Sequence, residues 1–146
     1  MSARINPYDA ATQTIAAMGE FQKRVSKTNL EPLLIELVKT RASQINHCAF
    51  CLEMHTREAR ALGETEARLY LLNAWRESSF YTPRERAALA WTEALTNLAE
   101  SGAPDEDYEL AHSVFSDQEL VDLTMAIVAI NSWNRISVGF RRPHAV

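Results

Sequence analysis

The sequence predicts an all-α protein, and three observations support that fold class. Glycine occurs 4 times and proline 5 times in 146 residues, so few tight turns are expected. Alanine, leucine, glutamate and arginine, which all favour helix, dominate the composition. Apolar side chains recur at the spacing of one helix face, and the alternation typical of strands is nearly absent. We therefore predict one domain over residues 1–146, a bundle of about seven helices without a sheet.

Four helices are predicted in the first half of the chain, and three of their boundaries are marked by single residues. Pro32 falls in the first turn of the second helix, where proline is tolerated. Asn46 and His47 interrupt the pattern after that helix, since asparagine tolerates left-handed backbone. Gly63 ends the third helix. The predicted ranges are 9–26, 31–45, about 48–62 and roughly 65–77.

Two capping boxes mark helix starts in the second half of the chain. Thr82–Glu85 and Ser116–Glu119 each pair a hydroxyl residue with a glutamate three positions later, and the first also has proline at the first helical position. The last helix is apolar on nearly every face between residues 123 and 130. It is a central core helix or part of a contact with another subunit, and the two interpretations are compatible. The predicted ranges are 82 to about 100, 105–114, and 116 to about 135 or 139.

Composition and charge argue against several classes of function. A net charge of −4 and a pI near 5.6 argue against nucleic acid as an obligate partner. The longest wholly apolar run, Met125–Ile130, is too short to span a membrane, and the N-terminal segment lacks the apolar stretch of a signal peptide. We therefore expect a cytoplasmic protein, in which thiols are kept reduced. A purely structural disulfide between the two cysteines is not expected, because so small a loop removes little unfolded-state entropy.

Both cysteines and two of the four histidines lie in one segment, QINHCAFCLEMHTREARALG, residues 44–63. On a helix, Cys51 and His55 share one face, and Cys48 lies one turn nearer the helix start. The unpaired N–H groups and the dipole of that first turn favour thiolate over thiol, and a neighbouring imidazole adds to the effect. Thiolates attack peroxides and disulfides, and a second thiol within reach then closes an intramolecular disulfide.

Glu36 is a carboxylate inside the apolar run LLIELV. It is either an exposed residue that pairs with Lys39, three positions later, or a buried group with a raised pKa. Its position alone favours the exposed pair.

Glu36, followed by the motif CxxCxxxH at residues 48–55, resembles the signature of the AhpD-like alkylhydroperoxidases of the carboxymuconolactone decarboxylase superfamily. The resemblance continues in YTPRERAALAWTEALTNL and in SDQELVDLTMAIVAINSWNRISVGFR, and it covers roughly residues 20–142. The cysteine pair places the chain with the peroxidase branch of that superfamily rather than with the decarboxylases.

The resemblance implies an AhpD-like helical fold that assembles as homo-oligomers, trimers or hexamers. It also implies thiol-dependent reduction of hydroperoxides, in which an external dithiol or a protein donor supplies the electrons and no cofactor or metal ion takes part. Glu36 is thereby expected at the site rather than in bulk solvent. The residues implied as a combined proton relay and redox pair are Glu36, Cys48, Cys51 and His55.

The chain departs from the family pattern between the two cysteines. Members of the family can carry a histidine there, whereas this chain has Ala49 and Phe50. His47 is an accessory candidate for that role. Arg135 is a second accessory candidate. It either pairs with Glu36, if the last helix packs against the second, or is an ordinary surface arginine.

The expected mechanism is a dithiol–disulfide cycle. Glu36, directly or through a water and His55, takes the proton from a thiol, and the thiolate attacks the O–O bond of a hydroperoxide. The other cysteine then condenses with the sulfenic acid. The position of His55 favours Cys51 as the attacking thiol, although in many CxxC proteins the first cysteine, here Cys48, attacks.

Three other interpretations of these residues stay open. The first is a thiol–disulfide reductase or adaptor whose partner is a peroxiredoxin or another protein. The second is a zinc site, although structural zinc sites normally draw a second pair of ligands from elsewhere in the chain. The third is a helical scaffold without catalysis. The zinc ligands would be Cys48, Cys51 and His55, with Glu36 or His47 as a fourth.

Overall fold

The computed structural model describes residues 2 and 4–144, and within that part of the chain it contains helices and no strand. The all-α prediction is therefore confirmed. The elements are α1 (Pro7–Ala10), α2 (Thr12–Val25), α3 (Pro32–Ile45), α4 (Ala49–Ala61), α5 (Glu66–Leu71), the 3₁₀ turn η1 (Leu72–Ala74), α6 (Pro83–Thr96), α7 (Leu98–Ser101), α8 (Asp105–His112) and α9 (Asp117–Gly139).

The described residues form nine α-helices, which is more than the sequence predicts. Ala11, with φ −140° and ψ 53°, separates α1 from α2. Asn97, with φ −95° and ψ 33°, separates α6 from α7. The helix predicted over 65–77 ends early, because α5 tightens into η1. Breaks of a single residue leave the apolar periodicity intact, which is why the pattern did not predict them.

Both predicted capping boxes form. The hydroxyl of Thr82 accepts from the backbone N–H of Glu85 at 3.2 Å, and the carboxylate of Glu85 accepts from the backbone N–H of Thr82 at 2.8 Å. The matching distances for Ser116 and Glu119 are 3.3 Å and 2.9 Å. Each box satisfies two N–H groups that a helix start leaves free, so α6 and α9 begin where the sequence predicts.

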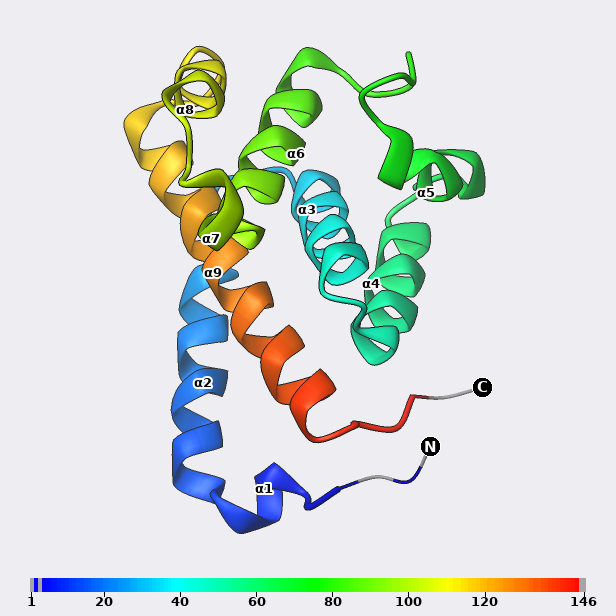
Figure 1. Ribbon diagram of the computed structural model, residues 1–146, viewed down its shortest axis with the longest axis vertical. Coiled ribbons are helices and arrows are strands. Elements are labelled where there is room, and N and C mark those ends of the chain that lie inside the picture. Colours follow the sequence, from blue (N-terminus) through cyan, green and yellow to red (C-terminus); the bar gives the residue numbers. More distant parts are fainter. Residues whose placement is uncertain (1, 3, 145–146) are drawn as a thin grey trace.

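Helix α3 lies at the centre of the molecule and packs against α4, α6 and α9, while α2 runs beside α9 (Figure 1). The main apolar core joins α3, α6 and α9 through side chains that include Val38, Ala88 and Leu123. A second cluster, which includes Leu37 and Leu89, lies on the other side of α3. This packing holds the end of α3 and the start of α4 against the C-terminal half of α9.

Helix α9 is buried on one face and open on the other. Leu123 and Ile127 are buried, whereas Val121, Met125 and Val128 are exposed. The helix therefore serves as a core helix on one side only. In the described part of the chain, no helix has both the length and the apolar character needed to cross a membrane.

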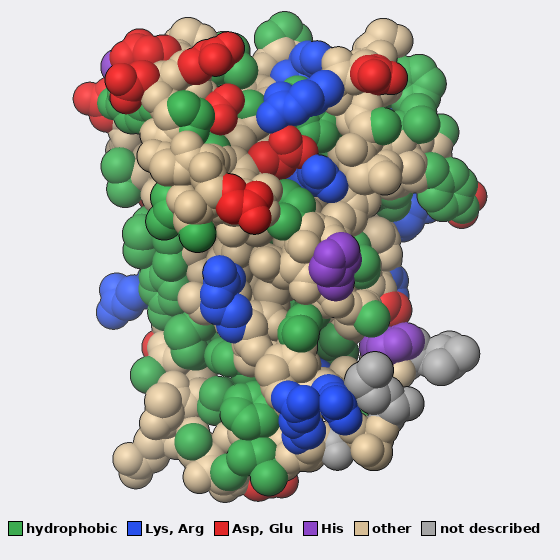
Figure 2. Space-filling view, in the orientation of Figure 1, with side chains coloured by type: hydrophobic (Ala, Val, Ile, Leu, Met, Phe, Trp, Pro, Cys, Tyr) green, Lys and Arg blue, Asp and Glu red, His purple; other side chains and the backbone are tan. Residues whose placement is uncertain are grey.

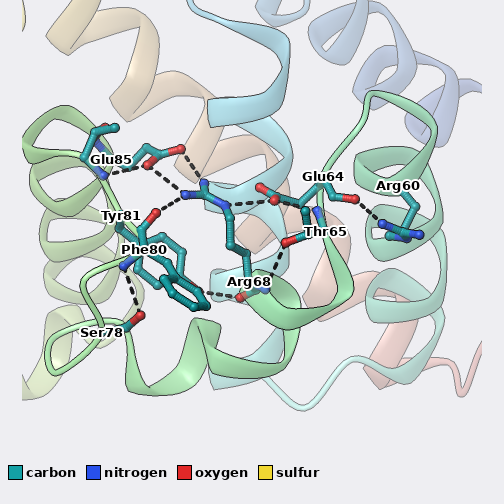
Figure 3. Close-up of polar contacts among 9 residues, drawn as sticks. Arg60, Glu64, Thr65, Arg68, Ser78, Phe80, Tyr81 and Glu85 are labelled. Carbon is teal, nitrogen blue, oxygen red and sulfur yellow. Dashed lines mark hydrogen bonds and ion pairs between the residues drawn. The ribbon is translucent and has the colours of Figure 1, made fainter.

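A buried charged cluster joins the start of α5 to the start of α6 (Figure 3). One carboxylate oxygen of Glu64 accepts from the backbone N–H of Thr65 and from Nε of Arg68, both at 2.8 Å. The Arg68 guanidinium also donates to Glu85 at 2.5 Å and lies 4.9 Å from the centre of the Tyr81 ring. The second oxygen of Glu64 is buried without a hydrogen-bond partner among the described residues.

Candidate redox-active site

The turn between α3 and α4 places Cys48 at the N-cap of α4. His47 has left-handed backbone, with φ 54°, whereas Asn46 has φ −83°. The left-handed position in the turn is thus His47 rather than Asn46. The Cys48 sulfur accepts a hydrogen bond from the backbone N–H of Cys51 at 3.3 Å. This bond satisfies one of the N–H groups that the first turn of a helix leaves free.

The side chain of Asn46 ties this turn to α9. Its Nδ2 donates to the side-chain oxygens of Asn131 at 3.0 Å and Asn134 at 2.9 Å. Asn134 in turn donates to the hydroxyl of Ser43 at 3.0 Å. A connected set of buried amides rigidifies its surroundings when every member is paired. The network therefore fixes the start of α4, and with it the cysteine pair, relative to α9.

Cys48 and Cys51 are joined by a disulfide. Each residue is only 1% exposed, and the pair packs against Ala42 of α3 and Ile130 of α9. Phe50, between the two cysteines in sequence, packs against the same cluster. The two sulfurs thus lie within the first turn of α4, close enough to bond without any change in the path of the chain.

Glu36 of α3 and His55 of α4 face each other in the interior, with exposed fractions of 6% and 5%. Glu36 Oε2 lies 2.8 Å from Nδ1 of His55, and Oε1 accepts from Nζ of Lys39 at 2.7 Å. The pairing with Lys39 is therefore present as predicted. The carboxylate is nevertheless buried, because the packing of α4 on α3 covers the face of α3 on which it lies.

The protonation of this pair follows from its surroundings. Burial raises the pKa of the Glu36 carboxyl, but the hydrogen bond from His55 and the ammonium group of Lys39 outweigh burial and hold that pKa below its ordinary value. A raised pKa, the alternative considered for a buried Glu36, is thus wrong. Because an ionised carboxylate can only accept, Nδ1 of His55 is the donor in this hydrogen bond, and Nε2 is the ring nitrogen that Glu36 does not bind.

A pocket of about 350 Å³ opens beside Cys51 and His55. Part of its wall is apolar, and Lys39 and Glu58 provide charged groups. The lining of one cavity therefore includes a histidine, one of the two cysteines and an apolar surface, a combination typical of small-molecule sites. The apolar side chains of the lining are Phe50, Met54, Ile130 and Trp133.

The two accessory candidates lie away from the Glu36–His55 pair. Arg135 donates to the backbone carbonyl of Asn131 at 2.9 Å and to its side-chain oxygen at 3.0 Å. Of the two alternatives for Arg135, the pair with Glu36 is not formed, since Glu36 is bound by other groups. His47 is exposed and lines a separate cleft beside Cys48, so its accessory role stays a prediction.

The structure brings together a different set of metal-ligand atoms from the one that the zinc alternative requires. Ligand atoms of Glu36, His55 and Glu58 lie within 4.8 Å of one another, and carboxylate and imidazole donors are acceptable to several divalent cations. The zinc alternative instead needs both cysteines as thiolates. In this structure their sulfurs are bonded to each other, so that donor set is not assembled.

Several residues around the site are absent from the sequence prediction. Glu58 lies 3.5 Å from Nδ1 of His55, and its spacing of three residues along α4 could have identified it. Arg142 and Tyr8 could not have been found in this way, since they come from opposite ends of the chain. Arg142 donates to the Tyr8 hydroxyl at 2.5 Å and stacks 3.8 Å from the centre of the Phe50 ring.

Comparisons with known proteins agree with this picture. The model of the carboxymuconolactone decarboxylase family matches residues 10–94. Uncharacterized protein YdfG of Bacillus subtilis (strain 168) is 42% identical over 139 residues, which is 95% of each chain. A crystal structure from Agrobacterium tumefaciens, of a protein of unknown function provisionally described as the antioxidant defence protein AhpD, is 47% identical, with a TM-score of 0.96 over 99% of each chain.

A more distant likeness concerns the fold alone. The debrominase Bmp8 without ligand has a TM-score of 0.80 at 17% identity, over 90% of this chain and 70% of Bmp8. The AhpD-like fold is thus shared with at least one enzyme, a debrominase, whose reaction is not the reduction of a peroxide. At that level of identity, the substrate of Bmp8 carries no information about this chain.

Proposed function

Because this chain belongs to the carboxymuconolactone decarboxylase family, as an AhpD-like member, we propose that it is a hydroperoxide reductase of antioxidant defence with Cys48 and Cys51 as its redox pair. The observation that carries the proposal is that one sulfur of the disulfide and the imidazole of the buried Glu36–His55 pair line the same pocket. A thiol needs a base to become a nucleophile, and the departing alkoxide needs an acid. A histidine oriented by a carboxylate supplies both.

In the first step, Cys51 attacks the hydroperoxide. Cys51 is assigned this role because it shares a pocket with His55, whereas Cys48 lines another cleft. His55 takes the thiol proton, and the thiolate sulfur attacks one peroxide oxygen. The O–O bond then breaks, and the proton passes from His55 to the alkoxide, which leaves as an alcohol. Cys51 becomes a sulfenic acid.

In the second step, Cys48 resolves the sulfenic acid. Its sulfur attacks the sulfur of Cys51, and hydroxide leaves as water with the proton from the Cys48 thiol. The backbone N–H that caps the Cys48 sulfur favours its thiolate and so supports this attack. An external dithiol or a protein donor then reduces the disulfide and restores both thiols.

Glu36 is the positioning residue of this scheme. Its carboxylate keeps the proton of His55 on Nδ1 and so leaves Nε2 free to exchange protons with the reacting atoms. Lys39 helps to keep that carboxylate ionised. The apolar wall of the pocket, which includes Met54 and Trp133, favours hydroperoxides that carry an organic group.

Peroxide consumption in the presence of dithiothreitol tests the proposal. We expect turnover of an organic hydroperoxide by the wild type and a loss of about 1000-fold or more in Cys51→Ser, which lacks the attacking thiol. Cys48→Ser keeps that thiol and is expected to lose less, because dithiothreitol can itself reduce the sulfenic acid on Cys51. Dimedone, which traps sulfenic acids, is expected to label Cys48→Ser after peroxide treatment and to leave Cys51→Ser unlabelled. Labelling of Cys51→Ser alone would reverse the two assignments.

The adaptor alternative predicts another outcome of the same experiment. It requires rapid reduction of a partner protein's disulfide together with slow peroxide turnover. A protein that neither consumes peroxide nor exchanges its disulfide contradicts both functions.

We further propose a cytoplasmic homo-oligomer, since the cycle needs a reducing compartment. The exposed apolar side chains of α9, Val121, Met125 and Val128, support a contact between copies of the chain. Light scattering in solution measures the number of copies.

A further inference from the structure

The two cysteines of the disulfide line different cavities. Cys51 lines the pocket of about 350 Å³ that also contains His55. Cys48 lines a separate cleft of about 540 Å³, between the start of α4 and the end of α9. Phe50 and Arg142 line both cavities, and the guanidinium carbon of Arg142 lies 3.8 Å from the centre of the Phe50 ring. This stacked pair therefore lies between the two cavities.

The cleft beside Cys48 differs from the other pocket in charge. Among the described residues that line it there are arginines and histidines but no aspartate or glutamate. Figure 2 shows Lys and Arg side chains gathered at the C-terminal end of α9. The pocket beside Cys51 contains Lys39 and Arg142 but also the acidic Glu58. The basic and imidazole side chains of the Cys48 cleft are His47, Arg141, Arg142 and His144.

This local charge opposes the charge of the whole chain, which is −4. A cleft lined by one sign of charge raises the local concentration of ligands of the opposite sign. The ligand that the Cys48 cleft favours is therefore an anion. Cys48, one half of the disulfide, is among the residues that line this cleft.

We propose that the Cys48 cleft is the reductant site, where a dithiol that carries a negative charge opens the disulfide, while the hydroperoxide enters through the Cys51 pocket. The proposal rests on the proposed function, in which the disulfide has to be reopened in every turnover. The basic side chains of the cleft have two effects. They attract the negatively charged reductant, and they stabilise its attacking thiolate. The two substrates then do not compete for one cavity.

The exchange balances with the dithiol as the only reductant. One thiolate of the reductant attacks the Cys48 sulfur, the S–S bond breaks, and Cys51 leaves as a thiolate. The second thiol of the reductant loses its proton and attacks the mixed disulfide, so that the reductant leaves as an internal disulfide and Cys48 as a thiolate. Two electrons pass to the cysteines, and the two protons of the dithiol neutralise the two thiolates. Cys51 is thus regenerated beside His55.

A matched pair of reductants tests the role of charge. Dihydrolipoate and dihydrolipoamide carry the same dithiol and differ in one carboxylate, which is replaced by a neutral amide. We expect dihydrolipoate to reduce the isolated disulfide about fivefold faster at low ionic strength, and we expect that preference to disappear in about 0.5 M salt. Equal rates at low salt overturn the proposal. Thiol release after rapid mixing measures the rate without any peroxide.

Charge reversal at the rim of the cleft provides the second test. Arg141→Glu is expected to remove or invert the preference for dihydrolipoate. Arg24→Glu, which makes the same change in net charge on the exposed side of α2, is the matched control and is expected to keep the preference. A preference that survives Arg141→Glu, or that Arg24→Glu abolishes equally, contradicts a local effect of the cleft. Circular dichroism checks that both variants fold.

The site of attack is read from the mixed disulfide. The anionic monothiol thioglycolate forms a mixed disulfide that rapid alkylation preserves, and peptide fragmentation locates it. We expect thioglycolate on Cys48 and the alkyl group on Cys51, and the reverse pattern overturns the proposal. These assays contain no peroxide, so they separate the two claims. Slow peroxide turnover together with charge-selective attack at Cys48 contradicts the proposed function alone. Fast peroxide turnover without charge selectivity contradicts this inference alone.

Discussion

Glu36 and Glu64 are both buried carboxylates with cationic neighbours, yet they differ in the type of partner and in whether that partner lines a pocket. Glu64, 2% exposed, is held by Arg68 and the backbone of Thr65 (Figure 3). Glu36 is held by Lys39 and by the ring of His55, and that ring borders the pocket that Cys51 also lines. Burial and pairing alone therefore do not distinguish a structural carboxylate from one that serves chemistry.

The partner of each carboxylate makes the distinction. Arginine stays protonated at every physiological pH, so a cluster built around Arg68 has a fixed charge. A histidine ring has two nitrogens that can each carry a proton, so the Glu36–His55 pair offers a route for proton transfer that the Arg68 cluster lacks. Access adds to this difference, because no residue of the Arg68 cluster lines the pocket beside Cys51. We therefore expect substitutions in the two regions to affect different measured quantities.

The largest effect is expected from Arg68→Met, on stability. The change leaves the buried Glu64 carboxylate with one hydrogen bond and removes the ion pair to Glu85, and breaking a buried pair in this way costs about 3 kcal/mol. Urea unfolding measures this loss. Peroxide turnover per folded molecule is expected to stay unchanged.

Arg57→Met is the matched control for that experiment. Arg57 pairs with Glu53 on an exposed face of α4, and such a surface pair contributes less than about 1 kcal/mol. A similar loss in both variants, or a drop in turnover with Arg68→Met, would show that the Arg68 cluster is not the purely structural region described above.

Glu36→Gln should act on turnover more than on stability. The amide keeps the shape of the side chain but cannot stabilise a charged imidazole, so we expect turnover to fall about 100-fold. Steady-state peroxide consumption across pH measures the effect. Glu58→Gln makes the same change in a carboxylate 3.5 Å from the same ring but half exposed, and it is expected to lower turnover less than about tenfold.

The smallest effect is expected on the pH dependence of stability. The pKa of Glu36 is lower in the folded protein than in the unfolded chain, because His55 and Lys39 outweigh the effect of burial. Between these two pKa values the unfolded chain binds more protons, so the contribution of Glu36 to stability is full above about pH 5 and decreases as the pH falls through the folded pKa.

Urea unfolding of the wild type and Glu36→Gln at several pH values measures that contribution. The difference in unfolding free energy between the two proteins is expected to shrink in acid. A difference that stays constant from neutral to acid pH would mean that the Glu36 carboxyl gains nothing from its partners.

Features that depend on neighbours in sequence could be predicted from the sequence. The capping hydroxyls of Thr82 and Ser116 act on residues three positions away, and both helix starts are where the sequence places them. The pair of Glu36 with Lys39 has the same local character. The two cysteines and His55 also lie within two turns of one helix, so their spacing alone predicts that they lie on the same side of it.

Features that depend on packing could not be predicted in this way. Whether Glu36 is buried depends on how α4 lies on α3, and a single-residue pattern does not contain that information. Arg142 reaches Phe50 only because the two ends of the chain meet, where Arg4 donates to the backbone carbonyl of Gly139 at 2.7 Å. The helix breaks at Ala11 and Asn97 were not predicted either. They change the backbone without changing which side chains face inward, so the apolar pattern does not record them.

Helix α4 begins on a sulfur atom, and that atom changes its electronic state in every proposed turnover. The backbone N–H of Cys51 lies against the Cys48 sulfur. An N–H group binds an anionic thiolate more strongly than the neutral sulfur of a disulfide. This contact therefore stabilises the reduced form of the cysteine pair more than the disulfide. The geometry that starts the helix thereby makes the protein an easier electron acceptor than the same pair would be in an unstructured peptide.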